Sequence, residues 1–310
     1  MRRGLCLFFA LLLVAVLPTF ANAEAALKMG DVDGSGVVSA ADASVVLRAV
    51  VQLDELDEAQ RVAADVDGNK SVDAADASKI LRYIVKLAPT LELDGSMTQQ
   101  VFSASEGDLS YWLYTPENAA VGMPLIIYLH GGSGKGSDLD MLVQNNGFPK
   151  YLQDGLLGEV PAFVIIPQLS EDSRGWVDIK DSVYGLVDYA CKHYLIDSEK
   201  ISLTGHSMGG TGTWQLALDN PSLFSRIAPL SGSVQTTEEN LEALKNLPVR
   251  AFVGSEDNIV SPNSSIQFIE NLRRINPNAE VTSFSGAGHS DVPALVYLDS
   301  EIGLIDWLIG

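Results

Sequence analysis

The stretch GHSMGG, residues 205 to 210, has a residue pattern that suits nucleophilic catalysis. It follows the strand-like run KISLT and precedes a helical pattern, so its glycines permit a sharp turn between the two. Ser207 then lies at a helix amino terminus, where the helix dipole favours negative charge. G-x-S-x-G alone is a weak signal, but the strand-turn-helix context predicts a nucleophile elbow with Ser207 as the nucleophile.

A serine nucleophile needs a base, and the chain has four histidines. His206 lies inside the elbow, so its side chain must diverge from that of Ser207. His193 lies on the edge of a helical segment, and His130 ends an expected strand in a setting that suits an oxyanion loop better than a base. His289 directly follows the last expected strand, where an α/β-hydrolase places its base in the order serine, acid, histidine.

The acid is expected at the end of the preceding strand. The run AFVGSEDNIV offers Glu256 and Asp257, and its G-x-x-D-x-x-V spacing favours Asp257, with Glu256 as the alternative. The acid would hold the tautomer of His289 and stabilise the imidazolium that forms during catalysis.

Backbone N–H groups near the nucleophile complete the predicted site. Those of Met208 and of the Gly131-Gly132 turn would bind the oxyanion. Trp176 follows the strand AFVIIPQ on the side where substrate enters, which favours either stacking on a sugar or aromatic acyl group or ordinary packing of the loop.

A second chemical pattern lies in two acidic loops, DVDGSGVVSAAD (31–42) and DVDGNKSVDAAD (65–76). Oxygen-bearing side chains fall at positions 1, 3, 5, 9 and 12, and position 7 offers its backbone carbonyl, as a hard cation with six to eight oxygen ligands requires. Two such loops in one register predict two structural Ca²⁺ ions. The predicted ligands are Asp31, Asp33, Ser35, Val37, Ser39 and Asp42, then Asp65, Asp67, Asn69, Ser71, Asp73 and Asp76.

Each loop leads into one amphipathic helix, SVVLRAVVQL or SKILRYIVKL, and no helix of comparable quality precedes it. The whole unit repeats after 34 residues. Position 6 of the second loop is Lys70, where glycine is expected. A left-handed non-glycine residue costs about 1 kcal/mol, so the second site is expected to be weaker.

Residues 30–88 therefore resemble a type I dockerin, a small all-α calcium-binding domain. The resemblance implies a partner, the cohesin module of a scaffoldin in a cellulosome. It also implies that loop positions 10 and 11 and the following helix contact the cohesin, and the near-identical repeats imply two interchangeable binding poses. The corresponding residues are Ala40, Ala41, Arg48, Ala74, Ala75 and Arg82.

The catalytic residues need a sheet to position them, and the chain beyond residue 98 supplies one. Apolar runs of strand length, such as MPLIIYLHG, AFVIIPQ and PVRAFVG, alternate with helical patterns around 138–154, 181–194, 208–219 and 262–275. VFSAS and LSYWLYTP are expected as edge strands. This alternation predicts a mostly parallel, three-layer α/β sandwich.

The body resembles the esterase D-like and carbohydrate esterase family 1 relatives of the α/β-hydrolases, which include feruloyl and acetylxylan esterases. The resemblance runs through PLIIYLHGGSGKGSD, GHSMGGTGTWQLALDNPSLFSRIAPLSG and the segments of Asp257 and His289, and covers nearly all of 98–310. Some members of this group are labelled predicted peptidases, which keeps a peptidase activity open.

Composition and the chain's start define the setting. Forty acidic and 20 basic residues give a net charge of -20, which would repel nucleic acid and anionic lipid. The apolar run after Arg2 and Arg3 and the Ala-Asn-Ala at 21–23 predict a signal peptide. The expected division is a signal peptide at 1–23, a dockerin at 24–88, a linker at 89–97 and a hydrolase at 98–310.

These expectations combine into a secreted cellulosomal serine esterase that removes acetyl or feruloyl groups from a plant cell-wall polysaccharide such as xylan, with no cofactor for catalysis. The alternatives are a serine peptidase or oligopeptide hydrolase of the same fold, and a scaffold-bound protein that only binds. A complete serine, acid and histidine set argues against the last.

Overall fold

The computed structural model describes residues 27–66, 71–85, 96–104, 107–116, 119, 122–194 and 196–310. The expected signal peptide, the ligands Asp67 and Asn69, and Lys70 lie outside these residues, as does most of the expected linker. The side chain of Arg82 is also outside the description.

In its described residues, the region that resembles a dockerin contains three helices: α1 (Ala40–Val50), α2 (Glu58–Ala64) and α3 (Ala74–Ile84). Both α1 and α3 begin at position 10 of an acidic loop. Ser39 or Asp73 at position 9 caps the helix, and the acid at position 12 bonds back to the cap backbone. Their apolar faces meet in a small core made of Val32, Ala43, Val46, Leu56, Ala64, Val66, Ala77 and Ile80.

Helix α2, before the second loop, was not expected. It has only seven residues and buries only Ala63 and Ala64, so no apolar stripe of helical spacing is visible in the sequence. Its start is nevertheless specified, because Asp57 and Gln60 form a reciprocal capping box.

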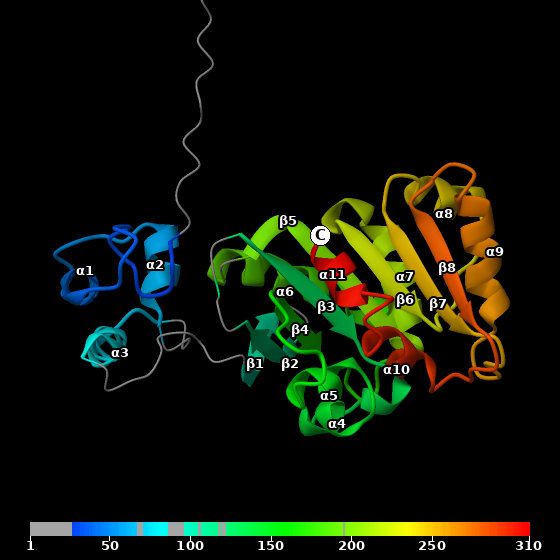
Figure 1. Cartoon of the computed structure of the whole chain (residues 1–310), viewed down its shortest axis with the longest axis horizontal. Coiled ribbons are helices and arrows are strands. Elements are labelled where there is room, and N and C mark those ends of the chain that lie inside the picture. The colour runs from blue at the N-terminus through cyan, green and yellow to red at the C-terminus, as the bar shows by residue number, and fades with distance from the viewer. Residues whose placement is uncertain are drawn as a thin grey trace, which may run out of the picture.

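The described residues of the second, larger region are built on one eight-stranded sheet with the order β1-β2-β4-β3-β5-β6-β7-β8 (Figure 1). β1 pairs antiparallel with β2, β2 antiparallel with β4, and every other pair is parallel. The strands are β1 (Ser96–Ala104), β2 (Gly107–Thr115), β3 (Met123–Leu129), β4 (Phe163–Pro167), β5 (Ile196–His206), β6 (Arg226–Leu230), β7 (Val249–Gly254) and β8 (Ala279–Phe284). The expectation that β2 is an edge strand was wrong, because it lies between β1 and β4 and buries its last five residues.

Helices cover both faces of this sheet, which confirms the predicted three-layer fold (Figure 1). One face packs against α6 (Lys180–His193), α7 (Met208–Asp219), α8 (Glu238–Ala243) and α9 (Pro262–Leu272). The other packs against α4 (Asp140–Gln144), α5 (Phe148–Gln153), α10 (Val292–Tyr297) and α11 (Leu304–Ile309). The helical pattern expected around 138–154 corresponds to two short helices, α4 and α5. None of the helices in the described ranges has the length and apolar character needed to cross a bilayer.

Candidate active site

Ser207 occupies the tight turn between β5 and α7, with φ 61° and ψ -118°. A positive φ is strained for a residue with a side chain, and such strain is characteristic of functional turns. Neighbouring glycines make room for it. A Cβ atom on Gly209 would lie 1.8 Å from the Leu129 carbonyl oxygen, and one on Gly210 would lie 2.2 Å from that of Leu230. The G-x-S-x-G-G sequence is therefore a steric requirement of this elbow.

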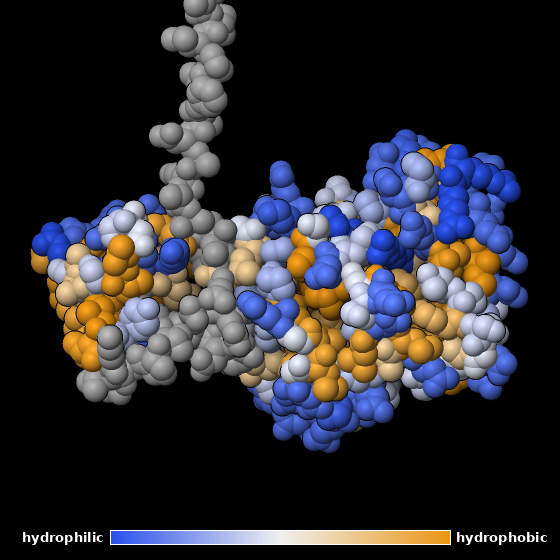
Figure 2. Space-filling view, viewed as in Figure 1, coloured by the Kyte–Doolittle hydropathy of each residue, from blue (hydrophilic) through white to orange (hydrophobic). Residues whose placement is uncertain are grey.

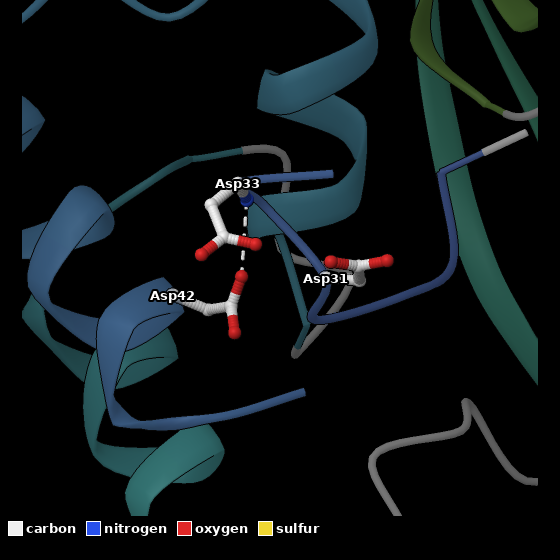
Figure 3. Close-up of side chains that lie close together, drawn as sticks. All are labelled: Asp31, Asp33 and Asp42. Carbon is white, nitrogen blue, oxygen red and sulfur yellow. Dashed lines mark hydrogen bonds between the residues drawn. The ribbon is translucent and has the colours of Figure 1, made fainter. Parts of the chain in front are cut away.

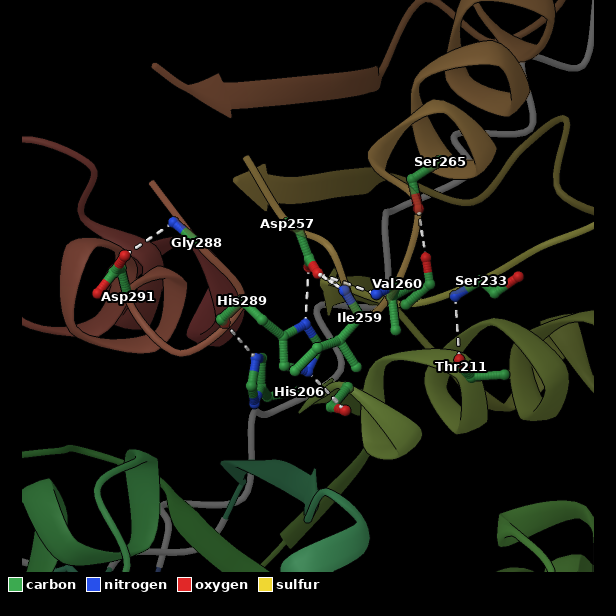
Figure 4. Close-up of polar contacts among 12 residues, drawn as sticks. His206, Thr211, Ser233, Asp257, Ile259, Val260, Ser265, Gly288, His289 and Asp291 are labelled. Carbon is green, nitrogen blue, oxygen red and sulfur yellow. Dashed lines mark hydrogen bonds and ion pairs between the residues drawn. The ribbon is translucent and has the colours of Figure 1, made fainter. Parts of the chain in front are cut away.

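The structure brings the three predicted catalytic side chains together. His289 Nε2 lies 2.8 Å from Ser207 Oγ. On the other side of the ring, His289 Nδ1 lies 2.7 Å from Asp257 Oδ2 (Figure 4). The other oxygen, Asp257 Oδ1, accepts the N–H groups of Ile259 and Val260, both at 2.9 Å. The carboxylate is thus fixed in the orientation that faces the imidazole.

Electrostatics favours an ionised Asp257. Burial alone would raise its pKa, but hydrogen bonds from His289 and from the backbone of Val260 and Ile259 outweigh burial and hold the pKa below its ordinary value. Glu256, the alternative acid, is exposed and takes no part in this chain of hydrogen bonds. An ionised Asp257 can hold a proton on His289 Nδ1, which leaves Nε2 free to accept the proton of Ser207.

The residues predicted to donate to the oxyanion lie close to the nucleophile. Met208 is the first residue of α7, and N–H groups of a first helical turn have no acceptor within the helix. Gly131 also lies against the serine, since a Cβ atom there would be 3.4 Å from Ser207 Cβ and 3.9 Å from Ser207 Oγ. Gly132 lies nearer the side chain of Met208, whose Cε would be 3.4 Å from a Cβ atom on it.

The loop that carries Gly131 is tied to the loop after β4 by several hydrogen bonds. His130 Nε2 accepts the N–H of Leu169 at 3.0 Å, and Gly136 N–H donates to the Leu169 carbonyl at 2.8 Å. Gln168 Nε2 donates to the carbonyls of Gly134 and Asp138 at 3.1 and 2.8 Å. These bonds fix the loop that was predicted to bind the oxyanion, and electrostatic stabilisation requires donors that are fixed in this way before substrate binds.

Trp176 is part of this connection, and the interpretation that it contacts substrate was wrong. Its side chain is 0% exposed and its Nε1 donates to the His130 carbonyl at 3.1 Å. Its ring meets the His130 ring edge-on at 4.9 Å, and a Cβ atom on Gly212 would lie 2.6 Å from it. The sequence shows that Trp176 lies in a loop near the site but not how deeply the loop folds inward.

Replacing Trp176 by alanine should therefore act on stability. We expect the free energy of unfolding to fall by about 3–5 kcal/mol, because the change empties a fully buried aromatic site. Urea denaturation of the two proteins measures this. A residue that only stacks on substrate would instead raise KM and leave the urea midpoint in place.

His206 is a site residue whose role the sequence did not reveal. Its Nε2 lies 2.9 Å from the backbone carbonyl of His289, so a protonated Nε2 donates to it, and the two rings lie 4.6 Å apart (Figure 4). Burial, and then the proximity of His289, lower the pKa of His206 to about 4. Burial likewise lowers the pKa of His130 to about 4. Both histidines are neutral at pH 7.

The two depressed pKa values predict acid sensitivity. The unfolded chain protonates each histidine near its ordinary pKa of 6.5, before the folded chain does, so acidification favours unfolding. We expect the free energy of unfolding to fall between pH 6.5 and pH 4 by about 3 kcal/mol for each histidine. The lowered pKa of Asp257 contributes only at lower pH.

Urea denaturation at pH 7 and pH 4.5 measures the slope of the free energy of unfolding against pH. His206→Gln should reduce it, whereas a matched change at the exposed His193 should leave it as it is. Equal slopes in the wild type and His206→Gln would contradict the assignment to His206.

A separate cluster of carboxylates lies in the first acidic loop. Oxygen atoms of Asp31, Asp33 and Asp42 lie within 4.8 Å of one another (Figure 3). Asp42 accepts the N–H groups of Asp33 at 3.0 Å and Ser39 at 2.7 Å, and Ser35 Oγ donates to the Val37 carbonyl at 3.1 Å. The loop therefore gathers the side chains at positions 1, 3 and 12, and it places the Ser35 hydroxyl against the position-7 carbonyl.

This donor set fits Ca²⁺. Asp31 and Asp42 are 2% and 0% exposed, and carboxylates so close together repel one another unless a cation or protons neutralise them. The ligands are all oxygen, as a hard cation prefers, and Gly36 at position 6 has φ 85°, which suits glycine there. In the second loop the structure describes Asp65, Ser71, Asp73 and Asp76, of which Asp76 is buried.

The residues expected to contact a cohesin lie on the dockerin surface. Ala40, Ala41, Ala74 and Ala75 are exposed, and Arg48 is exposed and paired with Asp54. Hydrophobic surface is visible over α1 and α3 (Figure 2). The exposed apolar side chains of these helices and their ends are Leu47, Val50, Val51, Leu53, Leu81 and Val85.

Each of the two regions matches a protein-family model. Residues 29–85 match the type I dockerin domain, and residues 170–292 match the dienelactone hydrolase family. The second match includes Ser207, Asp257 and His289.

A curated relative is the bifunctional acetylxylan esterase/xylanase of Neocallimastix patriciarum, 28% identical over 171 residues, which are 52% of this chain and 23% of that protein. Among solved structures, a thermostable esterase superposes with a TM-score of 0.59 at 24% identity, covering 70% of this chain and 63% of the other. The feruloyl esterase module of Clostridium thermocellum, solved with sinapinate, gives 0.53 at 16% identity and covers 66% and 86%.

Peptidases share the same fold. An acylaminoacyl peptidase gives a TM-score of 0.52 at 16% identity and covers 68% of this chain but 41% of the peptidase. The fold therefore does not by itself separate esterase from peptidase activity. The chain carries a type I dockerin domain and a dienelactone hydrolase fold, and it is homologous to an acetylxylan esterase/xylanase.

Proposed function

We propose that this chain is a secreted serine esterase that removes acetyl or feruloyl groups from plant cell-wall polysaccharide such as xylan. The observation that carries the proposal is the hydrogen-bonded chain from Ser207 through His289 to Asp257 at the nucleophile elbow. We further propose the division into a signal peptide at 1–23, a dockerin at 24–88, a linker at 89–97 and a hydrolase at 98–310.

The geometry supports a two-step acyl transfer. His289 Nε2 takes the proton of Ser207 as Oγ attacks the ester carbonyl, and Asp257 stabilises the imidazolium. The oxyanion lies against the N–H groups of Met208 and the Gly131-Gly132 turn. His289 then gives its proton to the leaving sugar oxygen, and the acyl group stays on Ser207. In the second step His289 Nε2 takes a proton from water as the water oxygen attacks the acyl carbonyl. The bond to Ser207 Oγ then breaks, the acid leaves, and His289 returns the proton to Oγ.

The dockerin supports a polysaccharide substrate. It would hold the enzyme on the cohesin module of a scaffoldin through Ala40, Ala41 and Arg48, or through Ala74, Ala75 and Arg82. Two Ca²⁺ ions would fold the loops, one held by Asp31, Asp33, Ser35, Val37, Ser39 and Asp42 and one by Asp65, Asp67, Asn69, Ser71, Asp73 and Asp76. The homology to an acetylxylan esterase/xylanase agrees with an enzyme that works beside polysaccharide-degrading partners.

A peptidase is the second candidate, because the fold also occurs in an acylaminoacyl peptidase. Amide cleavage demands protonation of a poor leaving group and usually a groove that orients several residues of chain. In the described part of the chain the hydrolase is one sheet with its covering helices, without an additional domain that could enclose a peptide. This favours the ester.

Product release by the purified full chain tests the proposal. We expect acetate from acetylated xylan or ferulate from feruloylated xylan, and negligible cleavage of oligopeptides. Ser207→Ala is the control and should release neither acid. Serine-dependent peptide cleavage, with no acid released from either xylan, would favour the peptidase.

A further inference from the structure

His289 lies on a loop, although its imidazole must meet two partners at once. The loop, residues 285–291, connects β8 to α10 and is largely exposed. Its first half is held by the connection after β7, where the Ala287 carbonyl accepts the N–H of Glu256 at 3.0 Å. That bond holds the chain two residues before the base, so the backbone of His289 needs a restraint of its own.

His206 supplies a restraint at this point. Its Nε2 lies 2.9 Å from the His289 carbonyl oxygen, and no other hydrogen bond to the His289 backbone is found among the described residues (Figure 4). A carbonyl oxygen can only accept, and a neutral imidazole has one protonated nitrogen, so Nε2 carries the proton and Nδ1 does not. The two rings lie 4.6 Å apart with 41° between their planes.

The donor is attached to a central strand of the sheet. His206 is the last residue of β5, which lies between β3 and β6, and its backbone pairs with Leu230 of β6. The next residue is the nucleophile, Ser207, whose N–H donates to the Leu230 carbonyl at 3.0 Å. The bond from His206 therefore joins the loop that carries the base directly to the strand that carries the nucleophile.

His206 provides this donor without a positive charge. Burial, and then the proximity of His289, lower its pKa to about 4, although the His289 carbonyl and Asp257 act in the opposite direction. A protonated side chain in the same place could also donate to the carbonyl. It would, however, put a second cation beside the imidazolium that forms on His289 and would oppose its formation. A neutral donor therefore suits this position.

We propose that His206 is a positioning residue for the general base, and that its hydrogen bond to the His289 carbonyl keeps the imidazole aimed at Ser207 Oγ. This inference rests on the proposed esterase mechanism and adds to it a residue outside the triad. Proton transfer from Ser207 depends on the 2.8 Å approach of His289 Nε2. A displacement of about 1 Å at a reacting group can lower the rate about 100-fold. Loss of the bond should lower kcat more than it changes KM, because the bond holds the base and not the substrate.

Two neutral amide substitutions test the bond. Glutamine places its amide nitrogen about as far from the backbone as His206 Nε2, whereas asparagine is one methylene shorter. We expect His206→Asn to lower kcat on 4-nitrophenyl acetate about 10- to 100-fold with KM within about twofold, and His206→Gln to recover most of that loss. Urea denaturation of both variants is the control, because a purely structural side chain would shift the urea midpoint and leave kcat of the folded enzyme in place. Equal kcat values for the two variants overturn the inference.

A second measurement uses the wild type and needs no variant of His206. Nitrogen-15 NMR of the His206 ring should show a protonated Nε2 and an unprotonated Nδ1 at pH 7. The opposite tautomer, or a doubly protonated ring, overturns the inference. Hydrolysis of 4-nitrophenyl acetate that depends on Ser207 tests the proposed function separately. Its absence contradicts the esterase, whereas its presence with the opposite tautomer, or with equal kcat values for the two amide variants, contradicts only the role of His206.

Discussion

Ser207→Ala should lower kcat for ester hydrolysis about 10³- to 10⁶-fold while the protein stays folded. The oxygen that attacks the ester is removed, and no other described hydroxyl is within hydrogen-bond distance of His289 Nε2. His289→Ala should cost a similar factor, because Ser207 is then left protonated. Asp257→Ala should cost somewhat less, since the histidine remains but its tautomer is no longer held.

Matched variants make this prediction specific. Glu256 is adjacent to Asp257 but exposed, so Glu256→Ala should leave kcat within about twofold of the wild type. His193 is an exposed histidine on α6, so His193→Ala serves the same purpose for His289. Initial rates on 4-nitrophenyl acetate, with circular dichroism as a folding check, provide the measurement. A larger loss in Glu256→Ala than in Asp257→Ala would show that the acid is wrongly assigned.

The elbow and its partners could be anticipated because their constraints are local. Glycine is required at 209 and 210 because a Cβ atom there would lie 1.8 and 2.2 Å from neighbouring carbonyl oxygens, so the sequence motif reflects the geometry directly. The sequence distinguishes Asp257 from Glu256 because the two residues follow the end of β7 at positions that differ by one. A difference of one residue is enough to turn a side chain away from His289. The elbow and the choice of Asp257 could therefore be predicted from the local sequence.

Features that depend on long-range packing could not be predicted in this way. Trp176 becomes buried only because Gly212 of α7, 36 residues later, leaves space for its ring. The bond from His206 to the His289 carbonyl joins residues 83 positions apart, and nothing around His206 in the sequence indicates it. Helix α2 is specified by its cap and two buried alanines, which is too little apolar surface to produce a periodic pattern.

Removing calcium should unfold the dockerin and abolish binding to a cohesin, while ester hydrolysis continues. Without the ion, the gathered carboxylates of Asp31, Asp33 and Asp42 repel one another, and Asp31 and Asp42 have little access to water. The helix starts depend on the same residues, because Asp42 bonds back to the backbone of Ser39 at the cap of α1. Loss of the loop geometry therefore removes the cap as well. None of these ligands contacts Ser207, His289 or Asp257.

Calorimetric titration of the full chain with Ca²⁺ after chelation tests this directly. We expect two binding events of unequal affinity, because Lys70 stands at position 6 of the second loop, and Asp42→Ala should remove one of them. Asp54→Ala is the matched control, since Asp54 is an acid of the same domain that pairs with Arg48 outside the loops. Loss of helical signal on chelation should accompany loss of binding to a cohesin module, whereas hydrolysis of 4-nitrophenyl acetate should persist. A full chain that takes up no calcium, or an Asp42→Ala variant that binds it like the wild type, would show that these carboxylates are held together without the ion.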